Sequence, residues 1–296
     1  MLINAKNMET LYTGFKTSFN HGFRSSTPQW QEVATMVPST TAQELYAWLG
    51  QFPRMREWIG DRQIKKMSGH TYTIKNKKFE STISVERDAI DDDAYGIYSP
   101  LFQELGLAAA THPDELVYAM LADGFNKHCY DGQYFFDSDH PVLVNDQETS
   151  VTNMHPGAET PWFLMDTRRA LKPLIFQKRR DYDLKRMDDA KDENVFMRDQ
   201  YLYGVDARCN VGFGFWQLAF GSKATLDKAA FRDARTRMMS QKSDEGRPLG
   251  VVPNVMIVGP GQSDAARDVI LAEKTNGGDT NTDRNLVKII EVPWLV

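Results

Sequence analysis

The residues best placed to do chemistry lie in two short stretches of the chain. In the first, Gly259-Pro260-Gly261 follows an apolar run and precedes a helical pattern, which is the setting of a dinucleotide-binding turn. The third glycine of that motif would fall at Asp264, whose carboxylate would repel a pyrophosphate at the helix N-terminus. Ser263 could be read as a hydrolase nucleophile, but every histidine lies at or before His155, and the hydrolase order places the histidine after the serine. We therefore expect Ser263 to be a helix N-cap.

The second stretch, Asp137-Ser138-Asp139-His140, carries carboxylates and an imidazole, with His128 and His155 near it in sequence. These groups bind metals, but their spacing matches neither a zinc HExxH site nor a calcium loop. A phosphate-cradling GxxxxGK motif is also missing from the sequence. We therefore expect a loop built from Asp turns, with no metal, no cofactor and no catalytic constellation. The sequence predicts that the protein is not an enzyme.

Composition limits the possible classes of function. The chain has 296 residues, of which 41% are apolar, enough for one large domain or two smaller ones. Its 35 basic and 40 acidic residues leave a net charge of −5, so a reader of DNA sequence is not expected. Cys129 and Cys209 form no CxxC pair, which favours two buried, reduced thiols. The N-terminus lacks the apolar core of a signal peptide and no run is long enough to span a bilayer, so we expect neither secretion nor a membrane partner.

The elements that would position these groups start with a strand and a helix. From 71 to 93 the pattern alternates, with Phe79, Ile83 and Val85 on one face, and then reaches the acids Asp91-Asp92-Asp93. We expect these acids to lie at the N-terminus of a helix, where the helix dipole favours negative charge. Apolar spacing predicts that helix over 95–121, with Ser99-Pro100 as cap and first turn and Pro113 causing a kink or restart.

The rest of the chain mixes strands and helices, so the predicted fold class is α+β. The stretch 125–160 is expected to be a connecting loop, and the charge-dense stretch 177–200 a solvated face. A helix is predicted from Thr225, and a strand, turn and helix over 254–274. The other predicted strands are 162–165, 174–176, 201–220 and 286–292. Strands near both ends surround a central mixed block, which indicates one domain interrupted by another.

Two segments leave alternatives open. In the first 29 residues, Tyr12, Phe15 and Phe19 have helical spacing, and this stripe either folds back on its own core or docks on a neighbour. Residues 30–90 interleave rings with basic side chains, which could serve as a platform for single-stranded nucleic acid. The pattern favours instead a two-stranded excursion whose strands alternate buried rings with solvated lysines.

Four blocks of sequence together resemble one family. They are PSTTAQELYAWLGQFPRMREWIGDR from Pro38, TYTIKNKKFESTISVERDAIDDD from Thr71, YLYGVDARCNVGFGFWQLAFGS from Tyr201 and EGRPLGVVPNVMIVGP from Glu245. In order and spacing they are similar to the major head subunit of Mu-like tailed phages, the gpT family, over nearly the whole chain. The resemblance implies the Hong Kong 97-type capsid fold. Its parts would be an N-terminal arm (1–29), an extended loop with the first peripheral-domain strands (30–90), a peripheral domain with a long spine helix (91–150), an axial domain (151–280) and a C-terminal strand returning to the core (281–296).

The function implied by this resemblance is that of a major capsid protein. Such a protein would self-assemble into hexamers and pentamers of an icosahedral shell in the host bacterial cytoplasm, with a scaffolding protein and a portal, and would enclose double-stranded DNA in the virion. The alternative is an encapsulin-like nanocompartment, which shares the fold. Rings and guanidinium groups of the extended loop are the expected contacts between subunits. These residues are Trp48, Phe52, Arg54, Arg56, Trp58 and Arg62.

Overall fold

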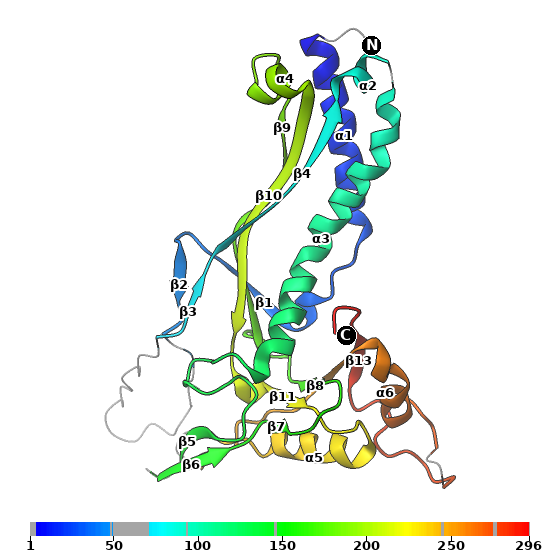
Figure 1. The fold of residues 1–296 in the computed structure, drawn as a ribbon. Helices are drawn as coiled ribbons and strands as arrows, with labels where there is room; N and C mark the ends of the chain where they lie inside the picture. Colours follow the sequence, from blue (N-terminus) through cyan, green and yellow to red (C-terminus); the bar gives the residue numbers. More distant parts are fainter. Residues whose placement is uncertain are drawn as a thin grey trace.

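A long arm rises from a broader base in the computed structural model of the chain (Figure 1). Two strands of 14 residues each, β9 (Leu174–Met187) and β10 (Gln200–Phe213), run antiparallel along this arm. They form the centre of a four-stranded sheet in the order β1-β9-β10-β4, in which β1 (Ala34–Pro38) is parallel to β9 and β4 (Lys77–Glu86) antiparallel to β10. The structure describes residues 4–47, 49, 71–92, 94–144, 147–243, 246–274 and 277–295.

Two long helices, α1 (Ala5–Ser25) and α3 (Ser99–Ala122), lie side by side along the arm (Figure 1). Phe15 of α1 stacks on Phe102 of α3 with ring centroids 4.2 Å apart, and both rings are buried. The N-terminal aromatic stripe therefore packs on the core of its own chain. The buried residues of this core are Met8, Leu11, Phe15, Phe19, Val85, Ile90, Phe102, Leu105, Ala109, Leu184, Val195, Tyr201, Tyr203 and Val205.

The strand and helix predicted around residues 71–121 are confirmed as β4 and α3, with two corrections. Asp91 and Asp92 lie at the end of a short helix α2 (Arg87–Asp91), and the 3-10 turn η2 (Ala94–Tyr98) separates them from α3, so they do not cap it. Ser99 is the first helical residue of α3 and Tyr98 occupies the cap position. The reason is that η2 leads into the long helix without the extended residue that a side-chain cap requires.

Pro113 lies inside α3, and the helix continues through it instead of restarting. The Thr111 hydroxyl donates to the Leu107 carbonyl oxygen at 3.1 Å, a bond that often accompanies a bend in a helix and does not replace the N–H that Pro113 lacks. Just beyond the proline, Asp114 accepts the backbone N–H of Trp30 at 2.6 Å. Packing of α3 against these distant segments outweighs the local preference of proline.

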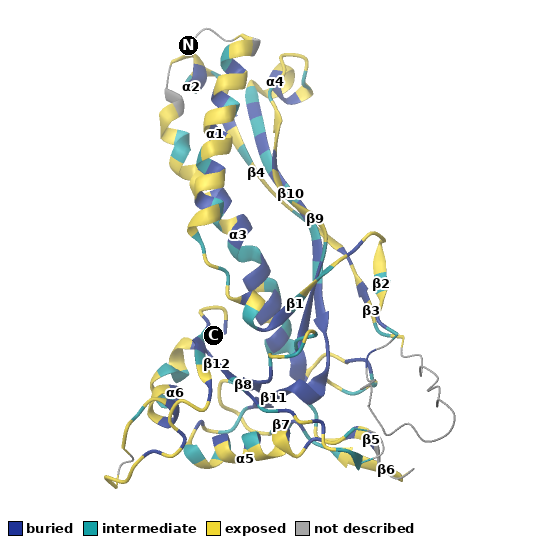
Figure 2. Cartoon of the chain, turned by 180° about the vertical axis from the view of Figure 1, so that it is seen from behind, coloured by how far each residue is buried: buried dark blue, intermediate teal, exposed yellow. Residues whose placement is uncertain are grey.

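The base is a five-stranded sheet in the order β13-β12-β8-β11-β7, with the helices α5 (Lys228–Met239) and α6 (Ser263–Ile270) beside it (Figure 1). All residues of its three central strands are buried, as Figure 2 shows by colour. Strands buried on both faces read as continuous apolar runs. The strands are β7 (Met154–His155), β8 (Trp162–Met165), β11 (Ala219–Ser222), β12 (Val255–Val258) and β13 (Lys288–Glu291).

Two hairpins and several short helices complete the described chain. The hairpins are β2 (Gln43–Leu45) with β3 (Thr73–Lys75) and β5 (His140–Val144) with β6 (Gln147–Val151). The short helices are α4 (Glu193–Arg198) and the 3-10 turns η1 (Trp30–Glu32), η3 (Asp123–Phe125), η4 (Trp216–Leu218) and η6 (Pro260–Gln262). None of the described helices combines the length and the apolar character needed to cross a membrane.

Three further expectations need correction, and one is confirmed. The stretch 125–160 contains the β5–β6 hairpin, and 177–200 contains the outer part of β9 together with α4. Gln262, not Ser263, occupies the cap position of α6, because the 3-10 turn η6 runs directly into the helix. Cys129 and Cys209 are both buried and free, as their spacing predicted.

Candidate functional site

The far end of the arm is a short, firmly held segment between β9 and β10, which we call the tip (residues 188–199) (Figure 1). Asn194 is buried, and its side-chain amide donates to the carbonyl oxygens of Met187 at 3.1 Å and Gln200 at 2.7 Å. These two bonds join the ends of the two strands. At the C-terminus of α4, Asp199 adopts a left-handed conformation with φ of 51°, and its carbonyl accepts the Arg87 N–H at 3.1 Å.

Large apolar side chains stand exposed on this rigid support. Phe196 is 83% exposed and Met197 is 69% exposed, although α4 has only six residues. Single exposed apolar residues are normal, but two adjacent large apolar side chains on an anchored helix form a patch that another molecule can cover. Sequence reasoning missed these residues because they lie within a charge-dense stretch. The signal that could have found them is an adjacent apolar pair in a segment otherwise expected to be solvated.

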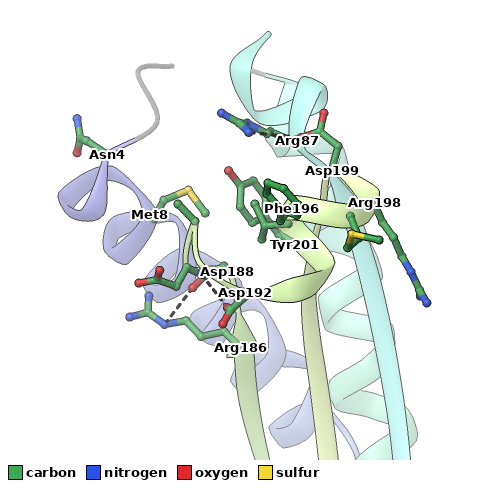
Figure 3. A pocket seen from close by; sticks show the side chains of 14 residues that line it. Asn4, Met8, Arg87, Arg186, Asp188, Asp192, Phe196, Arg198, Asp199 and Tyr201 are labelled. Atoms are coloured by element: carbon green, nitrogen blue, oxygen red, sulfur yellow. Dashed lines mark hydrogen bonds and ion pairs between the residues drawn. The ribbon is translucent and has the colours of Figure 1, made fainter.

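A hollow of about 900 Å³ opens beside the tip and is lined by the start of α1, the tip and the outer end of β10 (Figure 3). Arg186 crosses this region and forms an ion pair with Glu9 at 2.5 Å and a longer one with Asp188 at 3.6 Å. Tyr203 donates its hydroxyl to Asp188 at 3.2 Å. Burial raises the pKa of the Asp188 carboxyl, and this effect outweighs the opposing influence of Arg186 and Tyr203.

These contacts favour binding over catalysis. The described residues that line the hollow include carboxylates and arginines but no histidine, cysteine or serine, so no nucleophile is paired with a base there. The arginines Arg87 and Arg186 are both already engaged with acids of the same chain. A mixed-sign rim around exposed apolar side chains is the usual composition of a protein–protein contact.

All six contact residues predicted from the sequence, Trp48, Phe52, Arg54, Arg56, Trp58 and Arg62, lie outside the described residues. Their role as inter-subunit contacts stays a prediction. The described residues on either side of them are well anchored. The Tyr46 hydroxyl donates to Gln177 Oε1 at 2.8 Å, and the Gln177 amide donates to the Ile74 carbonyl at 3.0 Å. Both flanks are thus hydrogen-bonded to the same strand, β9.

The histidines considered as metal ligands from the sequence do not come together. His155 pairs with Asp233 of α5 at 2.7 Å, and His128 stacks on the Tyr134 ring with centroids 4.7 Å apart. An Asp turn forms just before the stretch 137–140, because the carboxylate of Asp131 accepts the backbone N–H of Gln133, two residues on, at 3.0 Å. The Asp137 carboxylate accepts the backbone N–H of its neighbour Ser138 at 2.7 Å, which is not an Asp turn.

His140 instead meets two residues that sequence reasoning did not connect with it. Its ring contacts Asp131, which in turn contacts Cys129, and the three potential ligand atoms lie within 4.8 Å of one another. Burial and the neighbouring Asp131 carboxylate both raise the pKa of the Cys129 thiol. The thiol is therefore neutral and unreactive. The eight residues between Asp131 and His140 match no known ligand spacing, so no local signal pointed to this group.

Comparison with known proteins gives one consistent result. The sequence pattern of the family described as "Mu-like prophage major head subunit gpT" matches residues 8–295. The "Mu-like prophage FluMu major head subunit" of Haemophilus influenzae is 42% identical over 274 residues, which cover 90% of this chain and 89% of that protein. The "Major capsid protein" of Escherichia phage Mu is 37% identical over 293 residues, covering 97% and 96%.

Solved structures agree with the sequence relatives. A chain from the procapsid of bacteriophage JBD30 superposes with a TM-score of 0.88 at 45% identity and covers 99% of this chain and 100% of that one. A chain from the bacteriophage JBD30 capsid superposes with a TM-score of 0.81 at 32% identity and covers 100% of both. These values establish a shared fold over the full length.

Proposed function

Because the chain belongs to the family of Mu-like prophage major head subunits, we propose that its copies form the hexamers and pentamers of an icosahedral shell that encloses double-stranded DNA. The protein is a major capsid protein of a tailed phage, with the Hong Kong 97-type capsid fold, and it is not an enzyme. An encapsulin-like compartment is not favoured, since the family match over residues 8–295 is to head subunits.

The observation that carries self-association is the exposed apolar pair on the tip. Phe196 (Figure 3) and Met197 are exposed on a helix whose flanking strands are joined through Asn194, so the surface needs little ordering on binding. Burying a fully exposed phenylalanine contributes roughly 2 kcal/mol. One such contact is weak, but a shell repeats it at every subunit. The second copy of the chain is the occupant to which we assign this surface.

Other partners belong to the same proposal. Assembly would take place in the host bacterial cytoplasm around a scaffolding protein, with a portal at one vertex. The net charge of −5 suits a container for DNA, because tight phosphate contacts release counterions on binding and would hinder packing and ejection. No sequence-specific contact with DNA is expected.

We also propose the division of the chain that the family resemblance implies. It consists of an N-terminal arm (1–29), an extended-loop segment (30–90), a peripheral domain with the spine helix (91–150), an axial domain (151–280) and a returning C-terminal strand (281–296). α3 is the candidate spine helix, being the longest described helix at 24 residues. β9 and β10 fall within 151–280 in sequence. In the long arm of the fold they form one sheet with β1 and β4, which fall within 30–90 in sequence.

The test is to replace Phe196 by serine and to follow shell formation by electron microscopy and sedimentation velocity. We expect Phe196→Ser to reduce closed shells at least tenfold, because each repeated contact loses its apolar anchor. Met239→Ser is the matched control, since Met239 is 40% exposed at the end of α5, far from the tip (Figure 1). Both variants should melt within about 2 °C of the parent subunit, as is usual for exposed positions. Normal shells from Phe196→Ser would remove the tip from the assembly surface.

A further inference from the structure

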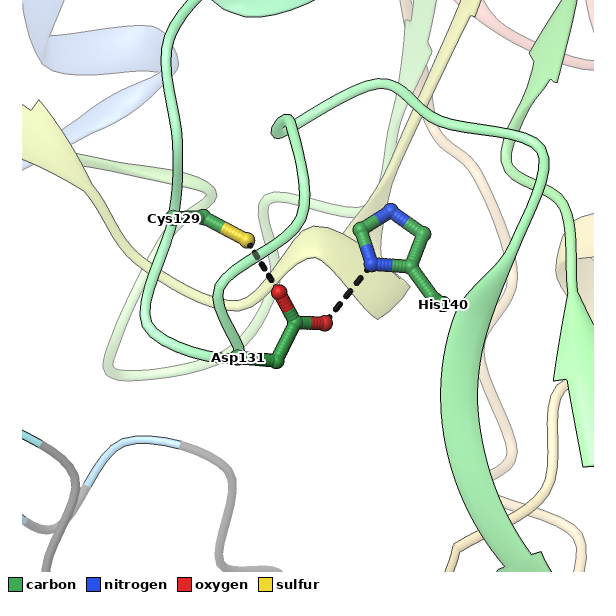
Figure 4. A group of neighbouring side chains, drawn as sticks. All are labelled: Cys129, Asp131 and His140. Carbon is green, nitrogen blue, oxygen red and sulfur yellow. Dashed lines mark hydrogen bonds and ion pairs between the residues drawn. The ribbon is translucent and has the colours of Figure 1, made fainter. Parts of the chain in front are cut away.

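A buried polar cluster lies where the long sheet meets the base, and it consists of Cys129, Asp131, His140 and Asn153 (Figure 4 shows the first three). Asp131 belongs to the turn after η3, His140 opens β5, and Asn153 directly precedes β7. The His140 ring stacks on Trp216 of η4, the turn that links β10 of the arm to β11 of the base. The cluster therefore ties together the segments at the junction of the two sheets.

The contacts within the cluster are short and sheltered from water. The Cys129 thiol donates to Asp131 Oδ1 at 3.0 Å, and His140 Nδ1 lies 2.7 Å from Asp131 Oδ2 (Figure 4). On its other side, His140 Nε2 lies 3.2 Å from Asn153 Oδ1. The side chain of His140 is fully buried and that of Asp131 is 7% exposed.

The orientation of Asn153 is decided by its surroundings. Its Nδ2 faces three carbonyl oxygens, those of Phe135 at 2.8 Å, Ala219 at 3.3 Å and Trp216 at 3.4 Å. Its Oδ1 accepts the backbone N–H of Asp137 at 2.9 Å. A flipped amide would place its oxygen against three other oxygens, so the oxygen must face His140. His140 Nε2 therefore carries a hydrogen.

This tautomer creates a conflict at the other ring nitrogen. In a neutral imidazole with its hydrogen on Nε2, Nδ1 is an acceptor, and here it would face the Asp131 carboxylate at 2.7 Å. Two acceptors at that distance repel each other unless a proton or a metal ion lies between them. A tetrahedral zinc site would hold nitrogen and oxygen ligands roughly 3.3 Å apart and sulfur and oxygen ligands roughly 3.5 Å apart. The observed 2.7 Å and 3.0 Å are shorter, as expected for hydrogen bonds.

Two further observations agree with a proton on Nδ1. Burial alone would raise the pKa of the Asp131 carboxyl, but hydrogen bonds from His140, Cys129 and Gln133 and the charge of His140 lower it overall, so Asp131 is the carboxylate of the pair. The Trp216 ring lies parallel to His140, 9° between planes and 3.9 Å between centroids, and an indole face attracts a cation.

We propose that His140 is held as an imidazolium, and that its ion pair with Asp131 is a clamp that holds together the junction between the two sheets. The titratable groups around His140 are Asp131 and Cys129 from the preceding turn and Asp139 beside it in the chain. From η4 it meets the Trp216 ring, and from the segment before β7 it meets the Asn153 amide. The clamp is independent of the shell-building role proposed above.

The direct test is nitrogen-15 NMR of the unassembled subunit, with the His140 ring assigned through its contact with Trp216. We expect both ring nitrogens to show the shifts of protonated nitrogens in chelator-treated protein, because the contacts of Nδ1 and of Nε2 each require a hydrogen. A neutral ring in that spectrum, or one zinc ion per chain by mass spectrometry with a metal-shifted Nδ1, would overturn the clamp.

Thermal unfolding supplies a second readout. Asp131→Asn should lower the melting temperature by roughly 5 to 15 °C near neutral pH, because it leaves a buried charge without its partner. Asp139→Asn is the control, since that carboxyl is fully exposed and its replacement should change little. An Asp131→Asn subunit that melts at the temperature of Asp139→Asn would overturn the clamp.

Discussion

Replacing Gly106 by alanine tests how closely the two helices of the arm approach each other. A Cβ at Gly106 would lie 2.1 Å from the Phe19 carbonyl oxygen and 2.8 Å from the Phe23 backbone nitrogen of α1. Both atoms belong to the backbone, so no side-chain rotation can remove the clash. The contact is matched from the other side, because a Cβ at Gly22 would lie 1.9 Å from the Gln103 carbonyl oxygen. Alanine at Gly106 therefore has to push α1 and α3 apart.

The size of the effect follows from that geometry. Ordinary contacts of a Cβ begin at 3.4 Å, so the helices must separate locally by roughly 1.3 Å. A gap of that size removes at least a quarter to a half of the dispersion energy between the facing side chains of the two helices. The stacked rings of Phe15 and Phe102 are among these side chains. Overpacking of this kind lowers the free energy of unfolding by about 3 kcal/mol, whereas the better helix propensity of alanine raises it by about 1 kcal/mol. The net loss of about 2 kcal/mol corresponds to a melting temperature lower by roughly 4 to 8 °C.

Gly14 provides a matched control within α1, because a Cβ there meets nothing within 4 Å. Gly14→Ala should raise the free energy of unfolding by up to about 1 kcal/mol, since only the helix propensity changes. The assay is thermal unfolding of the unassembled subunit followed by circular dichroism, with both variants in the same buffer. If Gly106→Ala melted at or above the temperature of Gly14→Ala, the close approach of the two helices would be refuted.

Two further predictions concern charge. Burial raises the pKa of the Asp166 carboxyl, but hydrogen bonds from Arg168 and from the Val252 N–H lower this pKa overall from 3.8. The stabilisation that the Asp166 carboxylate gives the folded protein is therefore present above pH 3.8 and is lost as the pH falls through the folded pKa. Asp166→Asn should therefore melt below the parent at neutral pH and converge with it in acid, once the pH has fallen below the lowered pKa of the Asp166 carboxyl, and a gap that persists in stronger acid would contradict this. Arg56→Glu should block or misdirect assembly while the subunit stays folded, because the predicted guanidinium–carboxylate contact of Arg56 would repeat at every subunit of a shell, and normal shells by electron microscopy would show that Arg56 is only solvated.

Local sequence patterns predicted much of the fold. Alternation found the inner face of β4, apolar spacing found α3, and the pattern from Thr225 found α5 with Phe231 buried on its inner side. The four blocks of sequence that begin at Pro38, Thr71, Tyr201 and Glu245 also identified the family, which the comparisons confirm. The outer part of β9 was missed because its charged residues are exposed and only Leu184 is fully buried among them. Such a strand looks solvated until its pairing with β10 is known.

The functional surface was less accessible to sequence reasoning. The six predicted contacts around Trp48 and Arg56 lie outside the described residues, so the structure neither supports nor contradicts them. The tip was not predicted, because the exposure of Phe196 depends on how Asn194 closes the ends of two long strands. The residue type alone does not show whether a phenylalanine is exposed or lies in the core.

The sequence by itself determined the segments with a clear apolar period, such as β4, α3 and α5, because periodicity acts through neighbours a few residues apart. It also determined the absence of a recognisable catalytic motif. Only the tertiary structure decided the partners of His140, since Asp131, Asn153 and Trp216 reach it from three other segments. Only the tertiary structure decided the contact of Gly106 with the Phe19 backbone, since that contact joins two helices far apart in the chain. Burial and hydrogen bonding depend on which distant segments the fold brings together, and periodicity within one segment does not record them.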